Sequence, residues 1–222
     1  MSGGDFRSFI AEATGAPPRD LSLYERAFTH SSTGKPSYDR LEFLGDRVLG
    51  AAIARWLYDR FADEREGELS SRFNALVARE TCAEIGRAIG IPTWIRLGRQ
   101  ARDDGASQSD NVVGDVVEAL IGALLLDRGM EAAEAFVRLH WAPLLDRQAG
   151  APQHPKSALQ ELAAARGAKP PAYAVVGRTG AHHAPRFTVS VAVAGLGEAS
   201  GEGSSKQDAE TAAAAALLKQ LS

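Results

Sequence analysis

Cysteine and long apolar runs are both scarce in this chain of 222 residues. Cys82 is the single cysteine, so the chain can form no internal disulfide and cannot build a thiolate metal site from that residue alone. One of the longest apolar runs, residues 119–126, is far too short to cross a membrane. The N-terminus has neither the basic start nor the apolar stretch of a signal peptide. These absences predict a cytoplasmic protein with no membrane partner.

Net positive charge is also lacking, since the formal charge of the whole chain is −3. This value gives no general attraction to nucleic acid. The charge is unevenly spread, however, because residues 149–222 hold only 7 of the 25 basic and 5 of the 28 acidic residues. An acidic first part therefore precedes a mildly basic second part, which predicts two regions with different tasks.

A change of pattern near residue 150 predicts two domains. The stretch QAGAPQHP has two prolines, a glycine and no apolar periodicity, as linkers do. We expect an all-α domain at 1–148, a linker at 149–154 and a small α+β domain at 155–222. The first domain shows helical periodicity, with a polar loop at 96–110 and helices near 5–14, 21–28, 38–60, 69–90, 110–127 and 131–147.

The second predicted domain has the order α-β-β-β-α. A helix is expected at 156–166, a strand at 172–177, an alternating strand at 186–194, a weak Gly-rich strand at 196–202 and an Ala-rich helix at 205–221. In the second strand, alternate positions share one face: Phe187, Val189, Val191 and Val193. This order predicts helices on one face of an antiparallel sheet.

Three acids interrupt the amphipathic stretch YDRLEFLGDRVLG at 38–50. At about 100° per residue, Asp39, Glu42 and Asp46 fall within one narrow arc of a helix. The apolar residues lie on the opposite side: Leu41, Leu44, Val48 and Ala52. A solvated acidic face accounts for this helix on its own.

A second stretch, DNVVGDVVEALIGALLLDRG at 110–129, repeats the arrangement. Asp115 and Glu118 share one face, and the apolar residues share the other. Gly50 follows Asp46 by four positions, and Gly122 follows Glu118 by four. Glycine costs a helix about 0.5–1 kcal/mol relative to alanine, so we expect these glycines to leave room for something to approach closely.

Two matching acidic helices can place four carboxylates around one point. Mg²⁺ and Mn²⁺ prefer such oxygen ligands and would remove the repulsion between them. Zinc does not fit, because no His or Cys accompanies the acids. A di-iron carboxylate bundle would need Glu-x-x-His motifs, which this sequence lacks. The spacing leaves a magnesium site and two solvated faces as alternatives.

Taken together, the motifs resemble those of the ribonuclease III family. The resemblance covers about residues 5–148 and 155–221, and the second region resembles a double-stranded-RNA-binding domain. It is carried by four stretches of the first region: THSS (29–32), DRLEFLGDRVL (39–49), REGELSSRFNALV (65–77) and GDVVEALIGALLLDRG (114–129).

The resemblance implies an Mg²⁺-dependent endoribonuclease that cuts double-stranded RNA to 5′-phosphate and 3′-hydroxyl ends, with Mn²⁺ able to substitute. Four acids match the catalytic and metal-binding carboxylates, with Glu118 expected to be indispensable: Glu42, Asp46, Asp115 and Glu118. By the same resemblance, Asp39 and Glu66 face the substrate, although Glu66 could also be an exposed acid before a helix cap at Ser70/Ser71. His30 would be a structural neighbour of the signature helix, and Arg47 has no assigned role.

The RNA contacts of the second domain also follow from the resemblance. Gln160 and Glu161 would enter a minor groove, His183 would do so from a loop, and Lys206 would meet phosphates at the start of the last helix. Family members usually have two adjacent lysines there, whereas Gln207 follows Lys206 in this chain. We therefore expect one phosphate contact to be missing and RNA binding by this domain alone to be weak.

The resemblance further implies a homodimer, with Phe43 and Leu44 as candidate contacts, and a role in processing ribosomal-RNA precursors and messengers. A catalytically silent double-stranded-RNA-binding regulator is the rival interpretation, but all four acids are present. A carboxylate-bundle hydrolase of nucleotides is a third, and it leaves the second domain without a purpose.

Overall fold

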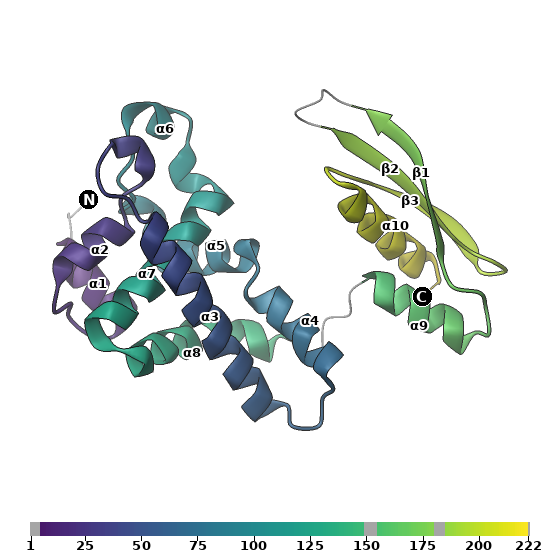
Figure 1. Cartoon of the computed structure of the whole chain (residues 1–222), viewed down its shortest axis with the longest axis horizontal. Helices are drawn as coiled ribbons and strands as arrows, with labels where there is room; N and C mark the ends of the chain where they lie inside the picture. Colours follow the sequence, from purple (N-terminus) through teal and green to yellow (C-terminus); the bar gives the residue numbers. More distant parts are fainter. Residues whose placement is uncertain (1–4, 149–154, 180–184, 222) are drawn as a thin grey trace. The chain divides into compact units, whose positions relative to one another are not determined.

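The structure is a computed structural model that describes residues 5–148, 155–179 and 185–221. The chain forms two compact units, one within residues 1–152 and one within 153–222 (Figure 1). The expected linker at 149–154 and the candidate RNA contact His183 lie outside the described residues.

The first unit is helical, as predicted. Its longer elements are α1 (Phe6–Thr14), α2 (Leu21–Ala27), α3 (Asp39–Arg60), α4 (Glu66–Leu76), α5 (Arg79–Ala88), α6 (Arg99–Asp103), α7 (Asp110–Arg128) and α8 (Met130–Asp146). Three 3₁₀ turns join them: Ser31–Thr33, Ile91–Thr93 and Ala106–Gln108. Helix α7 runs through the middle of the unit, and α2, α3, α5 and α8 pack against it (Figure 1).

The predicted helix at 69–90 was wrong, because the structure has two helices there. Helix α4 ends at Leu76, and Ala78 then adopts an extended backbone with φ −61° and ψ 144° before α5 begins. Two side chains donate hydrogen bonds to the last carbonyl groups of α4. The Trp141 indole donates to the Leu76 carbonyl at 2.8 Å, and the Thr81 hydroxyl donates to the Ala75 carbonyl at 2.7 Å. These side-chain donors replace the amides that would have continued the helix.

Two smaller expectations also need correction. The polar stretch 96–110 was expected to be a loop but contains α6 and a 3₁₀ turn. Helix α4 begins at Glu66 rather than after Ser70/Ser71, because Glu68 closes a capping box by accepting from the Arg65 amide at 2.9 Å.

Two glycines bring the backbones of α3 and α7 into direct contact. A Cβ atom on Gly45 would lie 1.7 Å from the Glu118 carbonyl oxygen, and one on Gly122 would lie 2.3 Å from the Leu41 carbonyl oxygen. The space beside Gly122 is therefore filled by α3 and not by a ligand. Gly50 faces the Phe73 ring, 3.5 Å from its would-be Cβ. The crossing brings the acidic arcs of the two helices together.

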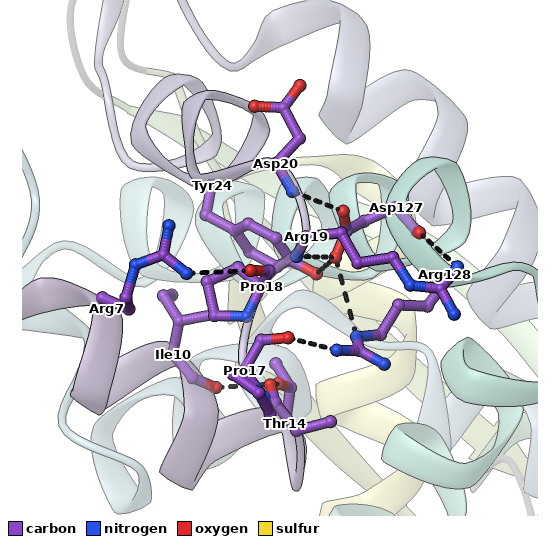
Figure 2. A network of polar contacts seen from close by, with 11 residues as sticks. Arg7, Ile10, Thr14, Pro17, Pro18, Arg19, Asp20, Tyr24, Asp127 and Arg128 are labelled. Carbon is purple, nitrogen blue, oxygen red and sulfur yellow. Dashed lines mark hydrogen bonds and ion pairs between the residues drawn. The ribbon is translucent and has the colours of Figure 1, made fainter.

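A buried carboxylate, Asp127, fastens the end of α7 to the segment before α2 (Figure 2). It accepts hydrogen bonds from the amides of Arg19 and Asp20 at 3.0 and 2.8 Å and from the Tyr24 hydroxyl at 3.0 Å. Burial alone would raise the pKa of Asp127, but these donors and the charge of Arg128 outweigh burial and hold the pKa below its ordinary value.

The second unit has the predicted order: α9 (Pro155–Ala165), β1 (Ala172–Thr179), β2 (Arg186–Val193), β3 (Gly197–Gly203) and α10 (Lys206–Leu221). The strands form an antiparallel sheet in the order β1-β2-β3. Val189, Val191 and Val193 are buried, which confirms the predicted alternation. Gly201 lets α10 approach the sheet, because a Cβ atom there would lie 2.2 Å from the Ala213 amide nitrogen.

The glycine contact predicts opposite outcomes for two alanine substitutions in α3. Gly45→Ala should force the helices apart and lower the free energy of unfolding by about 3 kcal/mol. Gly50→Ala should be neutral or stabilising by up to about 1 kcal/mol, because its added methyl group meets only ordinary contact and alanine favours the helix. Urea denaturation of both variants measures the difference, and equal stabilities would contradict the close contact of the two backbones.

The Asp127 network predicts a pH-dependent loss of stability. Asp127→Asn should lower the free energy of unfolding by about 2–3 kcal/mol at pH 7, because it leaves buried donors without a charged acceptor. The folded pKa of Asp127 lies below its ordinary value of 3.8. Its contribution is therefore complete above that value and is lost as the pH falls through the folded pKa.

Denaturation of the wild type and of Asp127→Asn at pH 7 and at pH 3 measures whether their difference in stability shrinks at the lower pH. Asp146→Asn serves as a matched control, because Asp146 pairs with Arg60 on the surface and its side chain is 60% exposed. The control should change stability by less than about 1 kcal/mol at either pH. An Asp127 variant no less stable than this control would contradict the network's role.

Candidate metal centre

Three carboxylates converge where α3 and α7 cross. Glu42 on α3 and Asp115 and Glu118 on α7 each offer an oxygen atom, and these atoms all lie within 4.8 Å of one another. All three residues are half-buried. They line a cavity of about 280 Å³ together with four further residues: Asp46, Val77, Arg79 and Gly114.

The backbone contact of the two helices fixes this arrangement. The Glu118 carbonyl oxygen faces Gly45, one turn after Glu42 and next to Asp46. Asp115 lies one turn before Glu118, so its side chain shares the same face of α7. The acids that periodicity placed on two separate faces therefore meet at one cavity.

Asp46 lines the same cavity but is not one of the three clustered acids. Its carboxylate forms an ion pair with Arg47, a residue whose role could not be assigned from the sequence. The Arg47 guanidinium also lies over the Phe43 ring, 4.9 Å from its centroid. One Asp46 oxygen therefore already has a cationic partner at the edge of the cavity.

Tyr38 supports the cluster, although the sequence did not indicate it. Its hydroxyl donates to an Asp115 carboxylate oxygen at 3.2 Å, and the residue is only 5% exposed. Burial and then the charge of Asp115 raise the pKa of Tyr38, so it remains a neutral donor. His30 packs against the Tyr38 ring, with 5.7 Å between centroids, and accepts from the Ser32 amide at 3.1 Å.

Burial and mutual repulsion perturb the titration of the three acids. Burial, followed by the charges of Glu42 and Asp115, raises the pKa of Glu118 to about 7. Burial is also the largest cause that raises the pKa of Glu42 and of Asp115. Such a group of oxygen donors fits a hard divalent cation, which would replace the shared protons and relieve the repulsion.

Asp39 and Glu66, the two expected substrate-side acids, do not line this cavity. Asp39 is exposed and accepts from the Ser37 hydroxyl at 2.8 Å. Glu66 is exposed and accepts from the Ser70 hydroxyl at 2.7 Å. Both remain available at the surface of the first unit.

In the second unit the expected RNA contacts that the structure describes are exposed. Gln160 and Glu161 lie on α9, and Lys206 is the first residue of α10. Asp208 caps that helix by accepting from the Ser205 amide at 3.1 Å. A carboxylate therefore occupies the first turn, close to the position where the sequence predicts phosphate contacts.

Comparison with known proteins decides the family. The Ribonuclease-III-like family matches residues 20–144, and the Double-stranded RNA binding motif matches residues 155–221. The chain belongs to the ribonuclease III family. Because it carries both the nuclease domain and the RNA-binding motif, it is an endoribonuclease that acts on double-stranded RNA, in a family whose cleavage depends on metal.

Individual relatives agree with this assignment. The chain is 58% identical over 221 residues to Ribonuclease 3 of Zymomonas mobilis, covering 100% of this chain and 90% of that protein. It is 46% identical over 214 residues to Ribonuclease 3 of Rhodopseudomonas palustris, covering 94% and 79%. The nuclease domain of ribonuclease III from Campylobacter jejuni matches with a TM-score of 0.58 and 28% identity, covering 60% of this chain and 97% of that one.

Within the part of the chain that the structure describes, no helix combines the length and the apolar character needed to span a membrane.

The raised pKa of Glu118 predicts that metal binding depends on pH. Below about pH 7 the cation must displace a proton from the cluster, so affinity should rise by up to about tenfold per pH unit and level off above pH 8. Calorimetric titration of the RNA-free protein with Mn²⁺ between pH 6 and pH 8 measures this slope. Glu118→Gln should bind weakly with little pH dependence, and a wild-type affinity equal at both pH values would contradict the prediction.

Proposed function

We propose that this chain hydrolyses phosphodiester bonds of double-stranded RNA with Mg²⁺ and leaves 5′-phosphate and 3′-hydroxyl ends. The observation that carries the proposal is the convergence of Glu42, Asp115 and Glu118 in one cavity of a chain that also has an RNA-binding motif. Ribosomal-RNA precursors and messengers are the proposed substrates, and the cytoplasm is the proposed location. Mn²⁺ would substitute, since it prefers the same oxygen ligands.

The four acids have distinct proposed roles. Glu42, Asp115 and Glu118 would hold the cation, and Asp46 would join them after releasing Arg47. A cation bound there would activate water and offset the charge that develops on the phosphate. Tyr38 keeps one Asp115 oxygen in a fixed direction through its hydrogen bond.

Substrate contacts would flank this cavity. Asp39 and Glu66 are exposed in the first unit, and we propose that they face the RNA. In the second unit Gln160, Glu161, His183 and Lys206 would meet the minor grooves and the phosphates of A-form RNA. Gln207 is neutral and Asp208 is acidic, so this helix start should contribute little to phosphate binding.

A homodimer would present one cluster to each RNA strand. In the Campylobacter jejuni ribonuclease III, a region of the nuclease domain is involved in dimer formation. In this chain Phe43 lies on α3 and is 62% exposed, so its ring is accessible to a second subunit. We propose that Phe43 and its neighbour Leu44 contact the second subunit.

Glutamine at position 118 should separate binding from cleavage. Glu118→Gln keeps the size of the side chain but removes its charge, so cleavage of long duplex RNA in Mg²⁺ should fall by at least about 10³-fold. RNA binding measured without metal should stay within about twofold, because phosphate contacts elsewhere provide it. Glu131→Gln, an exposed acid at the start of α8, is the matched control and should cleave normally.

The wild-type protein provides the wider test. If duplex RNA stays intact with Mg²⁺ present, the enzyme proposal fails and the silent-regulator interpretation gains support. Near-normal cleavage by Glu118→Gln would remove that residue from the metal site.

A further inference from the structure

A cationic side chain, Arg79, lines the cavity that holds the carboxylates. It is the first residue of α5 and is exposed. The pKa values of Glu42, Asp115 and Glu118 are raised chiefly by burial, and the charge of Arg79 is among the influences that lower them. Arg79 therefore lies close enough to affect all three acids electrostatically.

Two contacts with α7 hold Arg79 in place. If Gly114 carried a Cβ atom, that atom would lie 3.4 Å from the Arg79 Cγ atom and 3.3 Å from the Arg79 carbonyl oxygen. The absence of a side chain at Gly114 therefore leaves room for the aliphatic part of the Arg79 side chain. Its Nη1 donates to the side-chain oxygen of Asn111 at 2.9 Å. Asn111 and Gly114 belong to the same turn of α7 that leads into Asp115.

The hydrogen bond to Asn111 directs the guanidinium without neutralising it. Among the residues that the structure describes, no ion pair within 4.0 Å involves Arg79, whereas Arg47 pairs with Asp46. An arginine tethered by a neutral amide keeps its charge and its remaining donors for an anion. A planar guanidinium matches two oxygens of a phosphate, which is the anion that this cavity must admit.

We propose that Arg79 binds a phosphate oxygen of the RNA strand being cut and that Asn111 orients it; this rests on cleavage occurring at the neighbouring cluster. The acids that attract a cation also repel the RNA backbone. A fixed positive charge on the cavity wall offsets that repulsion on the side where the strand enters. Arg79 is then a substrate-binding residue, and Asn111 is a positioning residue.

This role predicts effects of opposite sign on metal binding and on cleavage. Removing a positive charge from the cavity should strengthen the attraction for a divalent cation, by about three- to tenfold in affinity. The same change should remove a phosphate contact and slow the reaction. A purely structural arginine would weaken both, because the cluster would lose its shape.

The experiment compares Arg79→Gln with Arg79→Lys, Asn111→Ala and the matched control Arg87→Gln. Arg87 lies on the same helix and pairs with Asp110, but it does not line the cavity. For each full-length variant, Mn²⁺ affinity is measured without RNA by calorimetry. Single-turnover cleavage of duplex RNA is then measured at saturating Mg²⁺ from subsaturating to saturating protein concentrations, so that a lost binding contact shows in the rate below saturation, and urea denaturation reports stability.

Arg79→Gln should bind Mn²⁺ about three- to tenfold more tightly and cleave at least about tenfold more slowly. Arg79→Lys should lie between Arg79→Gln and the wild type in cleavage, because it keeps the charge but loses the planar fork. Asn111→Ala should keep wild-type Mn²⁺ affinity within about twofold and still cleave more slowly, because it keeps the charge but loses the tether. Arg87→Gln should match the wild type in both measurements.

Two results would overturn the proposal. Normal cleavage by Arg79→Gln with tighter Mn²⁺ binding would mean that the residue only balances charge. Weaker Mn²⁺ binding together with slow cleavage would mean that it only supports the shape of the site. Both results differ from failure of the proposed function, in which the wild-type protein itself would leave the duplex uncut in Mg²⁺.

Discussion

The close contact of α3 and α7 is the constraint on which the rest of the first unit depends. Gly45 and Gly122 let two backbones touch where any side chain would collide with a carbonyl oxygen. The same contact sets how near Glu42 comes to Asp115 and Glu118. Repulsion among these acids would open the crossing, and the buried apolar faces of the two helices oppose that tendency.

The cavity at this crossing is tuned by opposing charges. The pKa of each of the three acids is raised, and two arginines with different hydrogen-bonding partners lie near them. Arg47 is paired with Asp46, while Arg79 is tethered to the neutral Asn111. In a site of this kind the carboxylates attract a cation and the arginine attracts a phosphate. Because these charges lie on different walls of the cavity, both ions can bind. The modest charge of the second unit agrees with recognition of RNA by shape more than by net attraction.

Much of this arrangement could be predicted from the sequence, because helical periodicity is local. The 3.6-residue repeat placed Asp115 and Glu118 on one face, and the two-residue repeat placed Val189 and Val191 in the core. The break before Ala78 could not be predicted, because one donor that satisfies the end of α4 is the Trp141 indole on another helix. The close approach expected at Gly122 is present, but only the fold reveals that the α3 backbone is what approaches it.

The site residues that sequence reasoning missed are those whose roles arise from contacts between elements. Tyr38 adjoins the acidic stretch, and its adjacency to Asp39 was the one local signal. Arg79 lies on a separate helix, in a stretch with no motif of its own. Anomalous diffraction from crystals soaked in Mn²⁺ tests whether Glu42, Asp115 and Glu118 form the metal site. We expect a peak among these three carboxylates, and crystals that still cleave RNA but show a peak only elsewhere would contradict this site.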